Sequence, residues 1–495
     1  MTASSDLRMT GIFKDREQQW LFLSLAVIFI SRIPFLFSGY GSEEDAWGLI
    51  LVARNIDLTG IYEVSRMPGH PLQELFLSGI WNWPAWLLNL LTAMVSTSGV
   101  YFFMLALKEW KVPHHILAGW ILAFTPIYYI NSTNVMDYTW AISLVMISMY
   151  FVSKDKFVFA GVMLGLAVGF RITAGAAGIA FAIFLLGQDR PVLKIMILAI
   201  TSLITALVSF LPAFEVYGTG FFTYYEYFPY PPLLKNIYKA TVGAWGVIGT
   251  VAVAAGIALA AGNYFLKIRN NIHPKEPLST FTSAASEAIQ RHQSKWLLLM
   301  SLAAMALFTF SFLKIPQKSA FVIPVIPFLV ILFCLLLTDK QLKFVAGSLI
   351  FSCFFFGINL DDNLRGSSAS PLALKTKIGN TPVAVDPLAG MVIADHQKRN
   401  RKIDYAQAIA SQLMTIQNKT VIIAGWWQNE INYFLLNQKP AHLELVYYEN
   451  KETLKSFSDK GFDILYLPEQ DYYNDLRFGG TGFTNDMAEA FPYTP

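Results

Sequence analysis

Three consecutive carboxylates, Glu43, Glu44 and Asp45, directly follow the first long apolar segment of this 495-residue chain. Ser42 before them would be the N-cap of an amphipathic helix that lies on a membrane, with the acids in its first turn. Each acid there stabilises the helix through its dipole by about 0.3–1 kcal/mol, so capping alone would explain one acid. Because three in a row point in different directions, we expect at least one of them to have a chemical role.

An arginine and a lone acid follow in the next polar segments. Arg66 lies in "EVSRMPGHPLQELF", where two prolines around a glycine impose an irregular turn. Irregular backbone at a membrane surface persists where it lines a cavity, and a guanidinium there can hold a phosphate with two hydrogen bonds. His70 in this turn could be a base, although a hydrogen-bonded turn residue is the simpler interpretation. Asp137 is the one charge in "NSTNVMDYTW", a position where an acid is usually just solvated.

Membrane helices must position these residues. Hydrophobic residues make up 54% of the chain, charged residues 14%, and the mean hydropathy is +0.44, which is more apolar surface than a soluble domain needs. No cleavage site follows the first apolar segment, so we expect it to be retained. We predict about eleven transmembrane helices. They lie near residues 20–37, 84–107, 114–131, 135–152, 157–170, 173–187, 194–213, 240–266, 296–313, 320–338 and 341–360.

The distribution of lysine and arginine predicts the orientation, because short cytoplasmic loops are enriched in them. One set of alternate loops holds most of these residues and is predicted to be cytoplasmic, together with the N-terminal segment 1–19. With an odd number of crossings, residues 361–495 then lie outside, as does the long first outer loop, residues 38–83. We expect an integral protein of the plasma (inner) membrane.

Few cations remain for the outer face. Any one of them could simply anchor its segment at the lipid headgroups by snorkelling. Several cations near the same carboxylates favour an anion site instead. The predicted outer cations are Arg32, Arg54, Arg66, Arg171, Lys235, Lys239, Lys314 and Lys318.

The C-terminal region, residues 361–495, has a different composition, because charges reappear and long apolar runs stop. "TPVAVD", "TVIIAG", "HLELVYY" and "FDILYL" predict short buried strands, separated by helical patterns such as "DYAQAIASQLM" and "NEINYFLLN". The alternation predicts a small α/β domain with a mostly parallel sheet. It has neither a GxGxxG nor a Walker motif, so we assign it no nucleotide. The two tryptophans of "GWWQNE" are expected to pack against the membrane domain.

Other kinds of site find little support. A net charge of +3 is too small to indicate a nucleic-acid partner. Both cysteines, Cys334 and Cys353, fall in apolar segments and resemble packing residues. No Ser/His/Asp or Cys/His set can be placed on one face, which argues against nucleophilic catalysis. We also expect no cofactor and no metal.

The order of these motifs resembles that of the GT-C superfamily of polytopic membrane glycosyltransferases, such as protein O-mannosyltransferases, aminoarabinose transferases and lipopolysaccharide-core transferases. The acids that open a surface helix, the basic residue beside Pro and Gly, and the acid after the third apolar segment carry the resemblance. "GVMLGLAVGFRITAG" and "LKIPQKSAFVIPVIPFLVIL" extend it, over roughly residues 20–360. The family's first acid is commonly Asp, whereas this chain has Glu43 there and Asp45 two residues later, so the base stays open among Glu43, Glu44 and Asp45.

The resemblance implies an inverting glycosyltransferase, a hexosyl- or pentosyltransferase, whose donor is a sugar linked through phosphate to a polyprenol. In such an enzyme a carboxylate takes the proton of an acceptor hydroxyl, on a lipid, glycan or protein, while the lipid phosphate departs. Asp137 would then orient the acceptor or tune the base. The residues implied to hold the phosphate are Arg66, Arg171, Lys314 and Lys318.

Two other classes of membrane protein are alternatives. A polytopic transporter is disfavoured because the hydrophobic segments show no repeat in the two halves and no charge in mid-span. A lipid-sugar flippase or a polysaccharide polymerase would share the outer basic residues. Neither requires a first loop that opens with carboxylates or a soluble outer domain.

Overall fold

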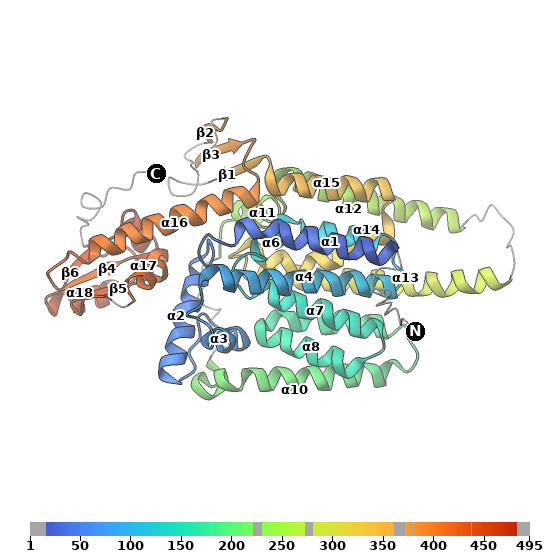
Figure 1. Ribbon diagram of the computed structural model, residues 1–495, viewed down its shortest axis with the longest axis horizontal. Helices are drawn as coiled ribbons and strands as arrows, with labels where there is room; N and C mark the ends of the chain where they lie inside the picture. Colours follow the sequence, from blue (N-terminus) through green and yellow to red (C-terminus); the bar gives the residue numbers. More distant parts are fainter. Residues whose placement is uncertain are drawn as a thin grey trace, which may run out of the picture.

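The main body of the protein is a bundle of long helices, shown by a computed structural model that describes residues 16–220, 230–272, 281–360, 372–378, 381–436 and 438–482 (Figure 1). Ten of the eleven predicted apolar segments coincide with one helix or with two consecutive short ones, and the segment 341–360 coincides with a helix followed by a strand. The bundle consists of α1 (Arg16–Arg32), α4 (Ala85–Glu109), α5 (His115–Ala123), α6 (Pro126–Asn131), α7 (Tyr138–Ser153), α8 (Phe157–Phe170), α9 (Ala176–Leu185), α10 (Pro191–Tyr217), α12 (Val242–Ile272), α13 (Phe281–Lys314), α14 (Ile326–Leu336) and α15 (Asp339–Phe354).

Six helical segments of the described residues are long and apolar enough to cross a membrane. They are α1 with the short helix η1 (Ile33–Phe35), α4, α10, α12, α13, and η5 (Ser319–Val325) with α14. The helices α7, α8 and α9 are apolar but shorter. Outward side chains of α10 are exposed, Leu203 and Leu207 each to 60%, as expected for a surface in contact with lipid. The chain is an integral membrane protein.

The predicted segment 114–131 is broken into two helices. Proline has no N–H to continue a helix and disfavours the helical conformation of the residue before it, so α5 ends at Ala123 and α6 begins at Pro126. Arg32, buried at the end of α1, donates to the carbonyl oxygen of Ala123 beside this break (2.6 Å) and lies 4.3 Å from the Tyr129 ring. Arg32 therefore joins helices inside the bundle and is not a snorkelling anchor.

Close packing between α8 and α10 places Arg171. A Cβ atom on Gly165 of α8 would lie 2.5 Å from Cβ of Thr205 on α10, so only glycine allows the two helices this separation. Directly after α8, Arg171 is extended (φ −157°, ψ 113°) and leads into the short helix η2 (Ile172–Gly175).

Two short helices, α2 (Glu44–Thr59) and α3 (Pro71–Ser78), lie across one end of the bundle (Figure 1). The expected N-cap of α2, Ser42, is wrong, because the N-cap is Glu43, and its side chain makes no capping hydrogen bond. Part of the apolar face expected to lie on the membrane instead packs against the C-terminal domain, where the Trp47 ring is 5.2 Å from the ring of Tyr433.

The C-terminal region contains two small sheets, so the expectation of one mostly parallel sheet is only partly right. β4 (Thr420–Ile423) lies between β5 (Leu443–Val446) and β6 (Asp463–Tyr466) in a parallel sheet. β3 (Thr381–Asp386) instead pairs antiparallel with β1 (Gly357–Leu360) and β2 (Leu374–Ile378). The strand β1 takes the last residues of the predicted apolar segment 341–360, because α15 already ends at Phe354.

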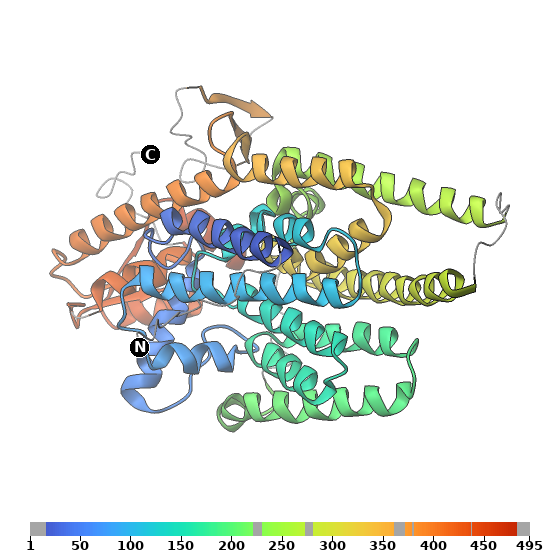
Figure 2. The same ribbon diagram turned by 45° about the vertical axis from the view of Figure 1, so that its right-hand side comes forward.

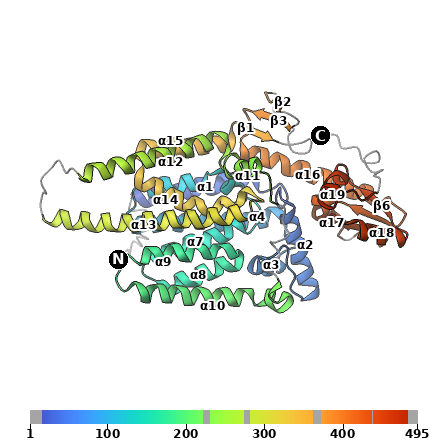
Figure 3. The same cartoon turned by 180° about the vertical axis from the view of Figure 1, so that it is seen from behind.

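Helix α16 (Met391–Leu413) runs from the bundle to the parallel sheet (Figure 3). Three further helices lie beside this sheet: α17 (Gln428–Leu435), α18 (Lys451–Asp459) and α19 (Gln470–Phe478). The two tryptophans do not pack against the membrane domain as expected. The Trp427 ring lies 4.5 Å from that of Tyr405, and the Trp426 ring 4.5 Å from that of Tyr473, all within the C-terminal domain.

The loops predicted to be cytoplasmic gather at the end of the bundle opposite α2. There Glu17 lies 3.1 Å from Lys108 and 3.0 Å from His115, and Asp339 lies 2.7 Å from Lys343. The C-terminal domain, orange to red in Figure 2, lies at the other end, beside α2 and α3. The two ends of the bundle therefore carry the two predicted sets of loops.

Candidate active site

Lys318 lies in the middle of an ion-pair group at the α2 end of the bundle. Its Nζ is 2.6 Å from Oε2 of Glu43 and also pairs with Oδ2 of Asp45. The hydroxyl of Tyr138 donates to the same Glu43 oxygen at 3.3 Å. Two of the three opening acids thus share a lysine from a loop that is distant in the sequence.

Arg66 connects these acids to Asp137. Its Nη1 lies 3.0 Å from Oδ2 of Asp45, and its Nη2 pairs with Oδ1 of Asp137. Its Nε donates to Nε2 of His70 at 2.9 Å. The guanidinium therefore uses all three nitrogens within the site.

Glu74 on α3 holds the turn that presents Arg66. Its buried carboxylate accepts from the backbone N–H and the hydroxyl of Ser65, both at 2.7 Å, and from the backbone N–H of His70 at 3.1 Å. These donors flank Arg66 in the chain, so Glu74 fixes the direction in which the guanidinium leaves the turn. The sequence analysis missed Glu74. An acid among the apolar residues of "PLQELF" was the available signal.

Asp137, the residue before α7, is buried among basic side chains. Arg171 Nη1 lies 2.8 Å from its Oδ2, and His70 Nδ1 lies 3.4 Å from the same oxygen. The Arg171 guanidinium also lies 4.5 Å from the ring of Tyr138 and 4.7 Å from that of Phe321. Asp137 is therefore the anchor of two arginines and is not a solvated acid.

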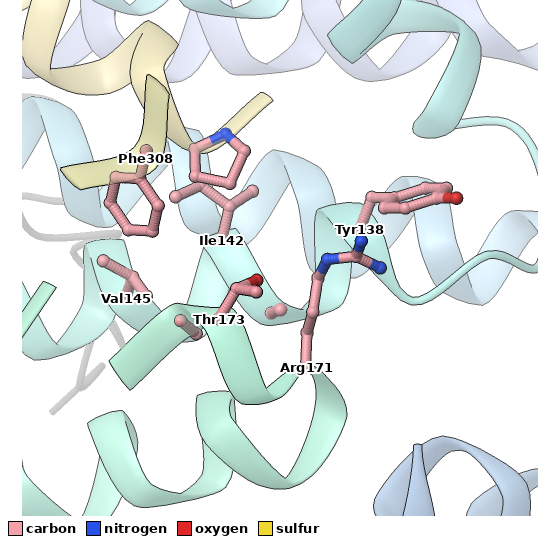
Figure 4. Close-up of a pocket in the computed structure, with 9 residues that line it drawn as sticks. Tyr138, Ile142, Val145, Arg171, Thr173 and Phe308 are labelled. Carbon is pink, nitrogen blue, oxygen red and sulfur yellow. The ribbon is translucent and has the colours of Figure 1, made fainter. Parts of the chain in front are cut away.

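A small pocket opens beside Arg171 and Tyr138 (Figure 4). Figure 4 shows the Arg171 side chain extending towards Tyr138 on one side of the pocket, with Val145 and Phe308 on the other. The remaining wall is mostly apolar and consists of Ala141, Ile142, Thr173, Ala174 and Pro324. A cation thus borders an apolar space.

The ion pairs and burial set the charges of the site. Burial would raise the pKa of Asp45, but Lys318 and Arg66 outweigh it and hold this pKa well below its usual range. The pKa of Asp137 is likewise lowered, because nearby basic groups outweigh its burial. Burial lowers the pKa of His70 to about 4. His70 is therefore neutral near neutral pH, and it accepts from Arg66 as a hydrogen-bonded turn residue.

Glu44 leaves the ion-pair group and turns towards the C-terminal domain. Its Oε1 accepts from the hydroxyl of Tyr447 at 3.4 Å, and its buried Oε2 has no hydrogen-bond partner among the described residues. Burial, together with the charges of Asp45 and Glu430, raises the pKa of Glu44 to about 8. Glu44 is therefore mostly protonated near neutral pH.

Lys314 also lies apart from the group. It is exposed at the end of α13 and forms no ion pair with a described residue. The structure thus brings together eight residues of interest, of which the sequence analysis missed Tyr138, because a tyrosine at the start of an apolar helix resembles an interfacial residue. The group consists of Glu43, Asp45, Arg66, His70, Asp137, Arg171 and Lys318, and Tyr138 lies within it.

The charged members of this group balance. Three cations, Arg66, Arg171 and Lys318, pair with the three carboxylates of Glu43, Asp45 and Asp137. Such a group can accept an anion if a carboxylate gives up its cation. Among the described residues, no group of three or more His, Cys, Asp or Glu side chains has the arrangement of a metal site.

No protein-family model and no curated protein matches the sequence. Among solved structures, the chain is similar to ArnT from Cupriavidus metallidurans bound to undecaprenyl phosphate, with 11% sequence identity and a TM-score of 0.53. The apo state of that protein has 10% sequence identity and a TM-score of 0.54 to this chain. Both similarities cover 93% of this chain and 95% of the ArnT chain. The chain therefore has the fold of ArnT, a GT-C aminoarabinose transferase, as the order of its motifs implied.

Proposed function

We propose that this protein transfers a sugar from a polyprenyl-phosphate-linked donor to an acceptor hydroxyl at the outer face of the membrane, with inversion at the anomeric carbon. The observation that carries the proposal is the balanced group of three cations and three carboxylates at one end of an ArnT-like bundle. The structure of ArnT with undecaprenyl phosphate supports a donor of the same kind.

We assign the general base to Glu43. Asp45 is a weak base, because two cations hold its pKa low, and Asp137 is 1% exposed between arginines. Glu44 points towards Tyr447. The Glu43 side chain is 26% exposed and pairs with one cation, Lys318, so it can meet an acceptor hydroxyl.

The transfer step keeps the charge of the site constant. The acceptor oxygen bonds to the anomeric carbon while its proton passes to Glu43, and the bond from that carbon to the phosphate oxygen breaks. The phosphate leaves with the electron pair and gains one negative charge as Glu43 loses one. Lys318, which pairs with Glu43 in the free protein, is then available to the departing phosphate.

The cations of the group are already in place for a phosphate. Arg66 and Lys318 each lie between two carboxylates, and Arg171 borders the apolar pocket of Figure 4. Fixed donors lose little orientational freedom when the donor binds, which favours stabilisation of the leaving group. Lys314 has no part in this arrangement.

The proposed topology places residues 1–19 in the cytoplasm and the end of the bundle that carries α2 outside. Residues 20–360 then form the catalytic membrane domain, and residues 361–495 form an extracytoplasmic domain. The ion pairs of the opposite end involve loops rich in lysine, such as those of Lys108 and Lys343, which is typical of cytoplasmic loops.

Release of polyprenyl phosphate tests the proposal directly. Purified protein is incubated with labelled polyprenyl-phosphate sugars and a membrane extract as acceptor. We expect release with the wild type and with Lys314→Met, and a large loss with Lys318→Met, which is the matched change inside the ion-pair group. Movement of the donor across a bilayer without release, for every sugar offered, would overturn the proposal in favour of a flippase.

A further inference from the structure

Helix α16 connects the C-terminal domain to the loop before Asp137. Arg399 on this helix is buried, and its Nη1 and Nη2 donate to the carbonyl oxygens of Thr133 (2.8 Å) and Ile130 (3.1 Å). Asp395, one turn earlier on α16, lies 2.7 Å from the Nε of the same guanidinium. Arg399 thus fixes two carbonyls of the turn that leads into Asp137.

About one turn further along α16, Lys402 reaches the loop that carries the other acids. Its Nζ donates to the carbonyl oxygen of Ser42 at 3.1 Å and pairs with Glu430 of α17. Both partners of the ion pair are buried. Since Ser42 directly precedes Glu43, the hydrogen bond lies next to the residue assigned as the base.

Domain docking alone does not require these two cations. Apolar and aromatic contacts already join the domains, as between Trp47 and Tyr433. A buried cation is costly unless each of its donors finds a partner, so an apolar residue would serve docking as well. The distinctive feature is the position of the backbone acceptors, because Lys402 donates to the carbonyl next to Glu43 and Arg399 donates to two carbonyls of the turn that precedes Asp137.

We infer that Arg399 and Lys402 are positioning residues for the transfer reaction. Through the backbone they hold Glu43 and Asp137 in the places where the three cations meet them, so that the C-terminal domain completes the active site. The inference rests on the proposed function, and it extends that function to a domain whose described residues contribute no charged side chain to the ion-pair group. A small displacement of a reacting group can lower the rate about a hundredfold, which makes such a role measurable.

The Lys402–Glu430 pair permits a matched experiment. Lys402→Met/Glu430→Gln removes both buried charges together and with them the hydrogen bond to Ser42. Glu430→Gln alone keeps that hydrogen bond, and Lys455→Met on α18 removes an exposed lysine from the same domain. We expect kcat of the double variant to fall about tenfold or more, with the donor KM within about twofold of wild type. Both controls should stay near wild-type kcat.

Two further readouts keep the inference testable. Amide hydrogen exchange over residues 41–46 should become faster in the double variant, and this measurement does not depend on turnover. Arg399→Lys keeps the charge but cannot reach two carbonyls, so its kcat should be higher than that of Arg399→Met and lower than that of the wild type. If the double variant does not fold, these two Arg399 variants test the inference in its place. Wild-type kcat and exchange in a folded double variant, or wild-type kcat in Arg399→Met, would overturn the inference. If the wild-type protein shows no turnover, the proposed function is rejected. The hydrogen-exchange rates over residues 41–46 would still show whether α16 holds this loop in place.

Discussion

Glu43→Gln separates general base catalysis from the other roles of the first acids. The amide keeps the size of the side chain and can still accept from Tyr138, while Lys318 keeps Asp45 as an ion-pair partner. The fold should therefore survive the loss of the base. A positioned general base contributes about 10²–10⁴-fold to the rate, which is about 3–5 kcal/mol of activation free energy.

The loss should appear in kcat and not in the donor KM. Removal of one carboxylate leaves three cations against two carboxylates, so the site should bind the donor phosphate at least as well as before. Single-turnover release of labelled polyprenyl phosphate measures the chemical step. Glu44→Gln is the matched control, because this neighbour faces Tyr447 and should keep near-normal turnover. A Glu43→Gln protein with wild-type kcat, beside an inactive Asp45→Asn, would refute the assignment.

Three further predictions concern the phosphate, pH and topology. Arg66→Ala should weaken transition-state binding of the donor by about 2–5 kcal/mol, measured as kcat/KM, because it strips one partner from buried charges, and Arg66→Lys should restore this only partly since an ammonium lacks the planar fork. Burial raises the pKa of Glu44 to about 8, so the folded protein keeps a proton that the unfolded chain releases above about pH 4.5. The thermal unfolding midpoint should therefore fall as the pH rises from about 5 to 8, and less so in Glu44→Gln; equal slopes would contradict the burial of this carboxyl. In intact cells, a cysteine at exposed Lys455 should react with an impermeant thiol reagent and one at exposed Lys340 should not, against a background of two buried native cysteines; the reverse labelling would invert the topology.

The helices of the bundle could be predicted because lipid leaves the backbone few choices. A segment in lipid must make its hydrogen bonds within itself, so a long apolar run is a helix. The same apolar run does not show where a helix breaks, because the break before α6 depends on a single residue, Pro126. The strands β4, β5 and β6 were predictable for a related reason, since short apolar runs between helical patterns form a buried parallel sheet.

The antiparallel sheet and the docking of α16 could not be predicted in this way. β1 follows α15 after a short connection and pairs with β3, and its few residues looked like the end of an apolar helix. Arg399 and Lys402 lie in a helix whose pattern is polar, and polar positions on a helix usually face water. Their burial depends on acceptors in the membrane domain, which the local pattern of α16 does not contain.

The choice between Lys314 and Lys318 shows how one residue decides the membership of the site. If α13 continued, residues four apart would lie on the same face of the helix. Pro316 prevents this, because it disfavours the helical conformation before it, and Lys318 is extended (φ −137°, ψ 142°). Lys314 therefore stays on the exposed last turn, while Lys318 turns towards Glu43, which lies 275 positions earlier in the chain.

The three opening acids diverge for a similar reason. Glu43 is extended (φ −89°, ψ 139°), whereas Glu44 and Asp45 already belong to α2, so adjacent side chains point to different partners. Glu43 and Asp45 meet Lys318, and Glu44 meets Tyr447, which is 403 positions away. The local pattern of three acids thus indicated that at least one exceeds the needs of capping. Which of them can act as a base is decided by cations and aromatic residues that only the folded chain brings together.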